Sequence, residues 1–151
     1  MKRVKGWEHK LEQLFNARLR TPFEWGTNDC CIFVADSVRS ITEVDISEWF
    51  RGRYQGRTKA FRLLKEFARG SVAETMDRIT TKYGMKEADP GSLLPGDVVT
   101  MKVIPLDPVA GRLAKGVTVG VQSFTKGAIL SPGKDGLVLS IQPYIHKAWT
   151  L

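Results

Sequence analysis

The sequence contains few of the residues that build metal sites and disulfide frameworks. It has two cysteines and two histidines in 151 residues. The cysteines, Cys30 and Cys31, are neighbours, and a disulfide between them would close a strained ring without joining distant segments. With His9 and His146 as the remaining candidates, the chain lacks the well-spaced ligands that a structural zinc site requires. We therefore expect no metal site, no other cofactor and no disulfide framework.

Long hydrophobic runs are absent as well. A membrane-spanning helix needs about 20 consecutive apolar residues, and no run in the sequence comes near that length. The basic N-terminus is followed by an amphipathic segment, so a secretory signal is not expected. Hydrophobic side chains make up 42% of the sequence and charged ones 26%, which is typical of a folded globular chain. We therefore expect a protein without a membrane span.

Positive charge is concentrated in one stretch of the chain. The formal net charge is +7 at pH 7, and between residues 51 and 69 the single acidic residue is Glu66. Such charge favours encounters with a polyanion or an acidic partner protein, although a solvated helix face explains it as well. Aromatic residues suited to stacking on bases are not interleaved with the charges, so we do not expect nucleic acid as a partner. The basic residues of the stretch are Arg51, Arg53, Arg57, Lys59, Arg62, Lys65 and Arg69.

Apolar residues at helical spacing predict two helices near the start of the chain. The first covers residues 7–20 and ends before Pro22. The second begins at Cys30, where Asn28 or Asp29 supplies the N-cap, and it presents one buried stripe. The stripes consist of Trp7, Leu11, Leu14, Phe15 and Leu19 in the first helix and of Cys30, Val34, Val38 and Ile41 in the second.

Two further helices follow a loop rich in Gly and Arg. The third helix ends at Gly70, since glycine readily adopts the left-handed conformation beyond a helix. Ser71 and Glu74 then form the pattern of a capping box, which predicts a fourth helix that closes at Gly84. The residues expected to face inward are Phe61, Leu64 and Phe67 in the third helix and Val72, Met76, Ile79 and Tyr83 in the fourth.

After residue 89 the periodicity changes from helical to alternating. Alternation over residues 98–103 and 117–122 predicts two strands. Residues 128–130 and 137–141 predict a hairpin, because the segment between them contains Pro and Gly, which supply turn conformations.

Residues 147–149 add one more short strand to the prediction. Helices followed by an antiparallel sheet are an α+β arrangement. With 151 residues, the chain is of the usual size for one hydrophobic core. We therefore expect a single α+β domain over residues 1–151, with a helical extension (1–22), a helical half (23–89) and a β half (90–151).

The start of the second helix carries the residues best suited to catalysis. A cysteine in the first turn of a helix meets unpaired backbone N–H groups and the positive end of the helix dipole, which both favour the thiolate. Cys30 occupies that position, and the loop from Trp25 to Asp29 could supply the polar groups of an oxyanion site. Alternatively, Cys30 is a small buried residue, and Asp29 is a helix cap.

Two segments resemble the signature of NlpC-type cell-wall peptidases. Residues 28–34, Asn-Asp-Cys-Cys-Ile-Phe-Val, resemble the Asp-Cys-Ser-Gly-Phe-Val motif of that superfamily, and residues 94–99 resemble its Pro-Gly-Asp-Leu-Val strand. Over roughly residues 23–149, a series of short elements is similar to a small domain family of bacteriophage tail gene clusters and prophages. The elements are Trp25-Gly26, Asp29-Cys30, Arg51-Gly52-Arg53-Tyr54, Gly96-Asp97-Val98-Val99, Val119-Gly120-Val121 and Ala148-Trp149.

The resemblance implies a papain-like fold and a particular catalytic arrangement. In NlpC-type enzymes the helix cysteine attacks an amide, and a histidine on a following strand is the general base. The family motif His-Val-Gly-Ile matches residues 118–121, and Thr118 stands at the histidine position. A threonine hydroxyl does not accept a proton near neutral pH, so the expected base is absent. His146 could replace it if the last strand lies beside the cysteine helix, whereas His9 is expected on an exposed helix face.

Two functions follow from these observations. The first is a structural component of a bacteriophage tail tip or baseplate, made in the host cytoplasm and carried in the virion, with other tail-tip or hub proteins as partners. The second is an active cysteine peptidase or amidase that cleaves peptidoglycan stem peptides, with Cys30 as nucleophile and His146 as base. A nucleic-acid-binding module that uses the basic stretch is a weaker third alternative. The residues expected to contact a polyanion or a partner are Trp25, Arg51, Arg53, Tyr54 and Arg57.

Overall fold

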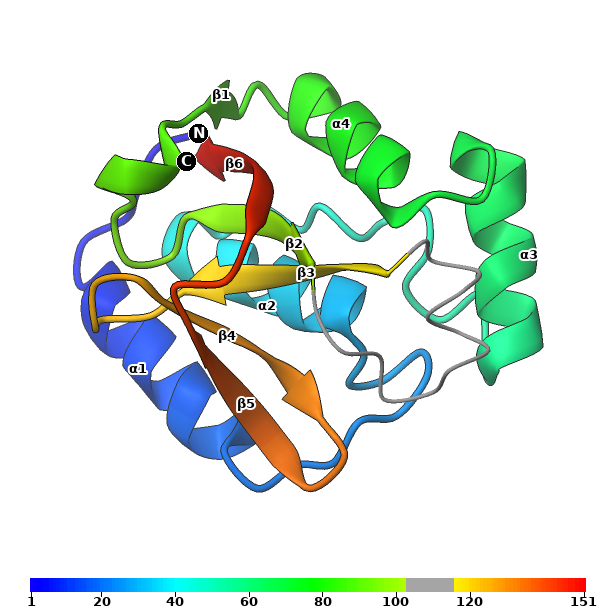
Figure 1. Ribbon diagram of the computed structural model, residues 1–151, viewed down its shortest axis with the longest axis horizontal. Coiled ribbons are helices and arrows are strands. Elements are labelled where there is room, and N and C mark those ends of the chain that lie inside the picture. The colour runs from blue at the N-terminus through cyan, green and yellow to red at the C-terminus, as the bar shows by residue number, and fades with distance from the viewer. Residues whose placement is uncertain (103–115) are drawn as a thin grey trace.

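The computed structural model describes residues 1–102 and 116–151. Four helices precede a set of strands, with one 3-10 helix among them (Figure 1). This order confirms the predicted α+β class. The elements are α1 (Trp7–Arg18), α2 (Cys30–Thr42), α3 (Arg57–Ala68), α4 (Val72–Lys82), β1 (Lys86–Glu87), η1 (Pro90–Ser92), β2 (Val98–Lys102), β3 (Val117–Gln122), β4 (Ala128–Gly133), β5 (Gly136–Ile141) and β6 (Ile145–Thr150).

The strands form one antiparallel sheet in the order β1-β6-β2-β3-β4-β5. Strand β6 is therefore inserted between β1 and β2. Helix α2 packs against β3 and β4, α1 packs against α2, and α4 packs against β3. In Figure 1, α1 and α2 lie behind the sheet, whereas α3 stands to its right and contacts α4. This arrangement places α2 between α1 and the sheet.

Helix α2 lies at the centre of the hydrophobic core. Val34, Val38 and Ile41 are buried, as the stripe predicted, but burial continues without a break from Ile32 to Val38. The prediction of a single buried stripe is therefore wrong. The reason is that α1 covers one side of α2 and the sheet covers another, so both sides are shielded from solvent.

Two helix starts follow local signals in the sequence. Asp29, rather than Asn28, caps α2, because its Oδ1 accepts a hydrogen bond from the backbone N–H of Ile32 at 3.0 Å. Ser71 caps α4, because its Oγ accepts a hydrogen bond from the N–H of Glu74 at 3.4 Å. The predicted start of the fourth helix is thus confirmed.

Helix α1 ends earlier than the periodicity predicted. Leu11 and Phe15 are buried, but the helix ends at Arg18, and Leu19 is 56% exposed. The core position expected for Leu19 is therefore wrong. The chain turns away at this point, since the N–H of Thr21 donates to the Arg18 carbonyl. In the later helices Val72, Met76 and Ile79 are buried as predicted, whereas Phe61, Leu64, Phe67 and Tyr83 are partly buried.

The two strands predicted by alternation are present as β2 and β3. Their burial does not alternate as expected, because four of the five residues of β2 are buried. Val98 belongs to the core that includes the helices, whereas Val99 and Met101 belong to a second cluster on the other face of the sheet. A strand with both faces covered has no polar side to show in its sequence. Val103, the last residue of the predicted alternation, lies outside the described residues.

The β4–β5 hairpin is tighter than the sequence predicted. Strand β4 ends at Gly133 and β5 begins at Gly136, so the predicted loop over residues 131–136 is wrong. Pro132 is tolerated inside β4 because it lies opposite Leu137 at a position where the two strands exchange no hydrogen bond.

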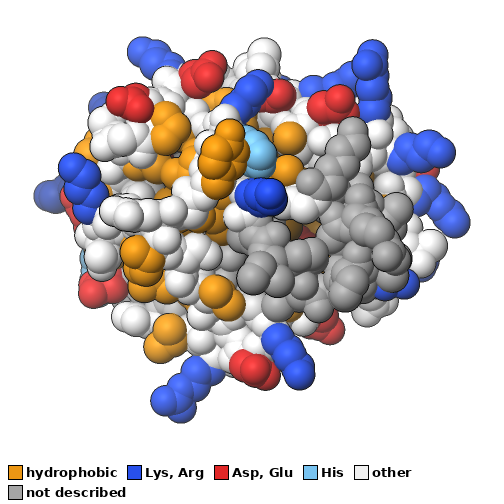
Figure 2. All heavy atoms as spheres, viewed as in Figure 1, with side chains coloured by type: hydrophobic (Ala, Val, Ile, Leu, Met, Phe, Trp, Pro, Cys, Tyr) orange, Lys and Arg blue, Asp and Glu red, His pale blue; other side chains and the backbone are white. Residues whose placement is uncertain are grey.

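Some elements of the fold were not predicted or were predicted too short. Strand β1 and helix η1 are too short to give a periodic signal, and β6 extends beyond residues 147–149 on both sides. On the face shown in Figure 2, most of the basic side chains lie around the periphery, and hydrophobic side chains are visible in the left half and near the centre. Among the helices of the described ranges, none has the length and apolar character to cross a membrane.

Candidate functional site

The loop before α2 is fixed by the carboxylate of Asp29. This side chain is 2% exposed. Its Oδ2 accepts a hydrogen bond from the N–H of Gly26 at 2.8 Å and another from the hydroxyl of Tyr54, while Oδ1 caps the helix. Tyr54 remains a neutral donor, because burial and the neighbouring Asp29 raise the pKa of its phenol. Asp29 thus holds the loop and Tyr54 around the start of α2.

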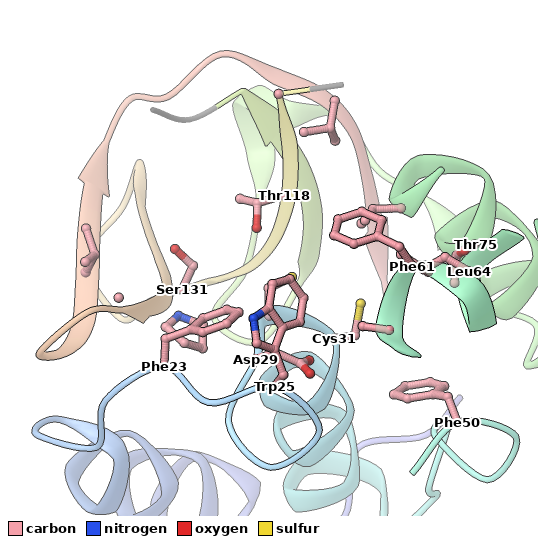
Figure 3. A pocket seen from close by; sticks show the side chains of 18 of the residues that line it. Phe23, Trp25, Asp29, Cys31, Phe50, Phe61, Leu64, Thr75, Thr118 and Ser131 are labelled. Atoms are coloured by element: carbon pink, nitrogen blue, oxygen red, sulfur yellow. The ribbon is translucent and has the colours of Figure 1, made fainter. Parts of the chain in front are cut away.

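Cys30 lies in the first turn of α2 and faces strand β3. The donors nearest its sulfur are the Cys31 thiol, the Thr118 hydroxyl and the N–H of Val119. These donors, above all the Cys31 thiol, lower the pKa of Cys30 although burial and the Asp29 carboxylate act against them. In Figure 3, Thr118 points from β3 toward the start of α2. The structure therefore brings together Cys30 and Thr118, the two positions that the sequence motifs paired.

The two adjacent thiols differ in their chemistry. The pKa of Cys31 is raised well above the ordinary thiol value, because Cys31 donates its proton to Cys30 and is itself buried. Both cysteines are free. The opposite directions of the two shifts favour Cys30 as the thiolate and Cys31 as its donor.

A cavity of about 700 Å³ opens beside Cys30. Six aromatic side chains contribute to its wall, and Figure 3 shows several of these rings around the start of α2. The ring of Trp25 packs edge-on against Phe23 at 4.9 Å and against Phe61 at 5.8 Å between centroids. A cavity of this size and character suits an apolar group of a ligand or partner. The aromatic residues of the wall are Phe23, Trp25, Trp49, Phe50, Tyr54 and Phe61.

Neither histidine of the chain lies at this cavity. His9 is exposed on α1, as the sequence predicted. His146 is exposed on β6, where its ring packs against Tyr144 at 5.0 Å between centroids. The hypothesis that His146 is the base required the last strand to lie beside the cysteine helix, but β6 pairs with β1 and β2. That condition is not met, because α2 packs against β3 and β4, whereas β6 lies on the opposite side of β2 from β3.

Arg51 is half-buried and forms ion pairs within the protein, which the sequence pattern did not predict. Its guanidinium contacts the Asp36 carboxylate at 2.7 Å and the Asp45 carboxylate at 3.2 Å. Asp36 is 6% exposed and also pairs with Arg18 at 2.8 Å and with Arg39 at 3.4 Å. A buried carboxylate needs such partners, since an unpaired charge would be costly to bury. Arg51 is held by the Asp36 and Asp45 carboxylates, and its role as a contact for polyanions or partners stays a prediction.

The other predicted contact residues divide into two groups. Trp25 and Tyr54 are partly buried in the cavity wall. Arg53 and Arg57 are exposed, and Arg53 donates to the carbonyl oxygen of Trp49 at 2.6 Å. The structure thus brings Trp25 and Tyr54 to Cys30 and leaves the two exposed arginines at the surface.

Sequence reasoning missed most of the cavity wall. Phe61 is far from Phe23 and Trp25 in the chain, and it meets Trp25 only in the folded protein. The alternation of Phe23 and Trp25 in the loop before α2 was the available signal, since it places two large rings on one side of an extended segment. In the parts of the chain that the structure describes, no three His, Cys, Asp or Glu side chains are grouped to hold a metal.

Comparison with known proteins adds one finding. No curated protein matches the chain. A family described as a domain of unknown function (DUF6950) matches residues 2–151, which include both Cys30 and Thr118. Because that match covers nearly all of the sequence, the chain belongs to the DUF6950 family.

Proposed function

We propose that this protein is a structural component of a bacteriophage tail tip or baseplate, built on a papain-like fold of the NlpC type that has lost its catalytic base. The observation that carries the proposal is the partner of Cys30. The thiol faces Thr118, and both histidines are exposed elsewhere. Without an imidazole beside the sulfur, papain-type hydrolysis lacks the group that takes the proton and returns it to the leaving amine.

The arrangement of the elements supports a papain-like fold. The cysteine lies in the first turn of a helix, and position 118 lies on a strand of the sheet that packs against this helix. The resemblance of the chain's short motifs to those of a family from phage tail gene clusters supports the tail assignment and, with it, the proposal that the protein is made in the host cytoplasm and carried in the virion.

In a protein without hydrolytic activity, the cavity beside Cys30 is available for binding. Its aromatic wall, which includes Trp25 and Tyr54, suits an apolar segment of another tail-tip or hub protein. The exposed basic residues Arg53 and Arg57 lie close in sequence to Tyr54 and favour a partner with acidic groups.

Purified phage particles test this proposal directly. Mass spectrometry should detect the protein in tails of the phage or prophage that encodes it, and deletion of its gene should leave tails incomplete. A protein that is absent from purified particles, together with normal tails after gene deletion, contradicts a structural role.

A peptidase or amidase is the second candidate, and one observation favours it. The pKa of Cys30 is lowered, and its sulfur lines a cavity large enough for part of a substrate. The purified protein should then release stem peptides from peptidoglycan fragments, and Cys30→Ala should abolish that release. If wild type and Cys30→Ala give the same products as buffer alone, the enzymatic candidate is excluded for this substrate.

A further inference from the structure

The two edges of the sheet are protected to different degrees. Strand β1 forms one edge with two residues, Lys86 and Glu87, which are both charged and exposed. Short, charged edge strands resist pairing with another chain. Strand β5 forms the other edge with six residues, Gly-Leu-Val-Leu-Ser-Ile, none of which is charged. The β5 edge therefore lacks the usual protection.

The backbone of β5 presents a defined set of outward-facing groups. Leu137 donates its N–H to the carbonyl of Leu19 at 3.1 Å, on the side away from β4. Gln142 donates its N–H in the opposite direction, to the carbonyl of Gly127, which directly precedes β4, at 2.7 Å. Successive residues of a strand alternate in direction. The N–H and C=O groups of Leu139 and Ile141 therefore point away from β4. Within the described ranges, no strand lies beyond β5 to receive them.

Exposed apolar side chains accompany these backbone groups. Val138 is 46% exposed, Leu139 49% and Ile141 65%. Tyr144, just beyond the strand, is 69% exposed, and Leu19, whose carbonyl meets the start of β5, is 56% exposed. Hydrophobic side chains are visible on this part of the surface in Figure 2. Exposed apolar side chains beside an open strand edge are typical of an interaction site.

We propose that β5 pairs antiparallel with β5 of a second copy of this chain, so that the two sheets join edge to edge. The register centres on Ser140. Leu139 then lies opposite Ile141 of the second copy, and each such pair exchanges both of its N–H···O bonds. The next position would place Leu137 opposite Pro143 of the second copy, which has no N–H to donate. Pairing therefore stops there, and the bond from Leu137 to Leu19 is kept.

A second copy fits this edge better than a charged partner strand does. A two-fold contact requires a surface complementary to itself, and an uncharged strand brings no like charges face to face. The net charge of +7 on each copy opposes association at long range, and salt screens that repulsion. Self-association should therefore tighten as salt is added, whereas binding of an acidic partner would weaken. The small contact predicts a dissociation constant on the order of micromolar or higher.

Analytical ultracentrifugation across a range of protein concentration, at low and high salt, tests the proposal. We expect a monomer–dimer equilibrium that shifts toward dimer with salt. Leu139→Lys places a charge beside the two-fold axis in both copies and should raise the dissociation constant by about tenfold or more. Leu94→Lys is the matched control, because Leu94 is 57% exposed and precedes β2, which β3 and β4 separate from β5. It should leave dimerisation unchanged.

Amide hydrogen exchange followed by NMR locates the contact. The amides of Leu139 and Ile141 should exchange rapidly in dilute protein and become protected as dimer forms, whereas Val138 and Ser140 should be protected at every concentration. A protein that stays monomeric overturns the proposal. So does a dimer in which the Leu139 and Ile141 amides still exchange rapidly, or an edge that pairs only with a strand of a different protein. If Leu139→Lys fails to fold by circular dichroism, Ile141→Lys serves in its place.

Discussion

The hydrogen-bond donors around Cys30 determine its reactivity at the scale of single residues. Because these donors lower its pKa, Cys30 should react with iodoacetamide at lower pH than an ordinary thiol does. The midpoint of its rate-against-pH profile should lie below the ordinary thiol value of about 8.5. The thiolate is the reacting species and is populated above the pKa, so a lower pKa extends reactivity to lower pH. Cys31→Ser keeps a hydrogen-bond donor at this position and should preserve the midpoint. Cys31→Ala removes the donor and should raise the midpoint. Mass spectrometry of the alkylated peptide measures the rates.

His146→Ala is the control for that experiment. The side chain is exposed on β6 and packs against Tyr144, so its removal should leave the pH profile of Cys30 unchanged. A profile that moves to ordinary thiol values in His146→Ala would mean that the imidazole reaches the sulfur in solution, and the peptidase candidate would regain its base.

Tyr54 ties the loop after α2 to the start of that helix. Tyr54→Phe removes the hydroxyl that donates to Asp29 and should lower the free energy of unfolding by about 1 kcal/mol, because a buried carboxylate loses one of its donors. Urea denaturation measures the change. Tyr144→Phe is the matched control, since that side chain is 69% exposed, and its stability should equal that of the wild type. Equal stability of both variants would contradict a role for the Tyr54 hydroxyl in holding the site.

Single residues also show where prediction from sequence succeeds. The cap formed by Asp29 was predictable, because its partner Ile32 is three residues away and the rule is local. The pairing of Cys30 with Thr118 followed from motif resemblance, which carries information about distant segments. Neither a local rule nor a motif resemblance predicted the ion pair between Arg51 and Asp36. An ion pair between separate elements leaves no periodic pattern in the sequence.

At the scale of elements, the buried carboxylate of Asp36 connects α2 to α1 and to the segment before α3. Asp36→Asn leaves the guanidinium groups of Arg18 and Arg51 without their buried counter-charge and should lower the free energy of unfolding by about 3 kcal/mol. Thermal and urea denaturation measure the loss. Glu43→Gln is the matched control, because Glu43 pairs with Lys10 at the exposed surface. A loss as large in Glu43→Gln as in Asp36→Asn would argue against a special role for the buried network.

The elements themselves were predictable to the extent that each has one face in water. Helices α1, α3 and α4 are amphipathic, so apolar residues at helical spacing predicted them. The full burial of α2 and of β2 was not predictable in this way, because an element covered on both sides shows no polar face. The extension of β4 through Pro132 depends on the direction of its hydrogen bonds, which composition does not encode.

At the scale of the whole molecule, the site exists only because the two halves of the chain meet. Cys30 comes from the helical half and Thr118 from the β half, and α2 packs against β3 where they meet. The family match over residues 2–151 includes both halves. Under the proposed NlpC-type fold, an active hydrolase would differ from this chain at the side chain that faces the sulfur, so the proposal is open to experiment at position 118.

Thr118→His places an imidazole opposite the Cys30 thiol and tests that difference. An imidazolium beside the sulfur stabilises the thiolate, so alkylation of Cys30 at pH 6 should rise by about tenfold or more over the wild type, whereas Thr118→Val removes a donor and should slow it. The same variant should be assayed for release of stem peptides from peptidoglycan. Release that requires both Cys30 and the new histidine would show that the rest of a catalytic site has been retained. Unchanged alkylation in both variants would mean that position 118 does not face the sulfur, and the proposal of a fold that lost its base would lose its support.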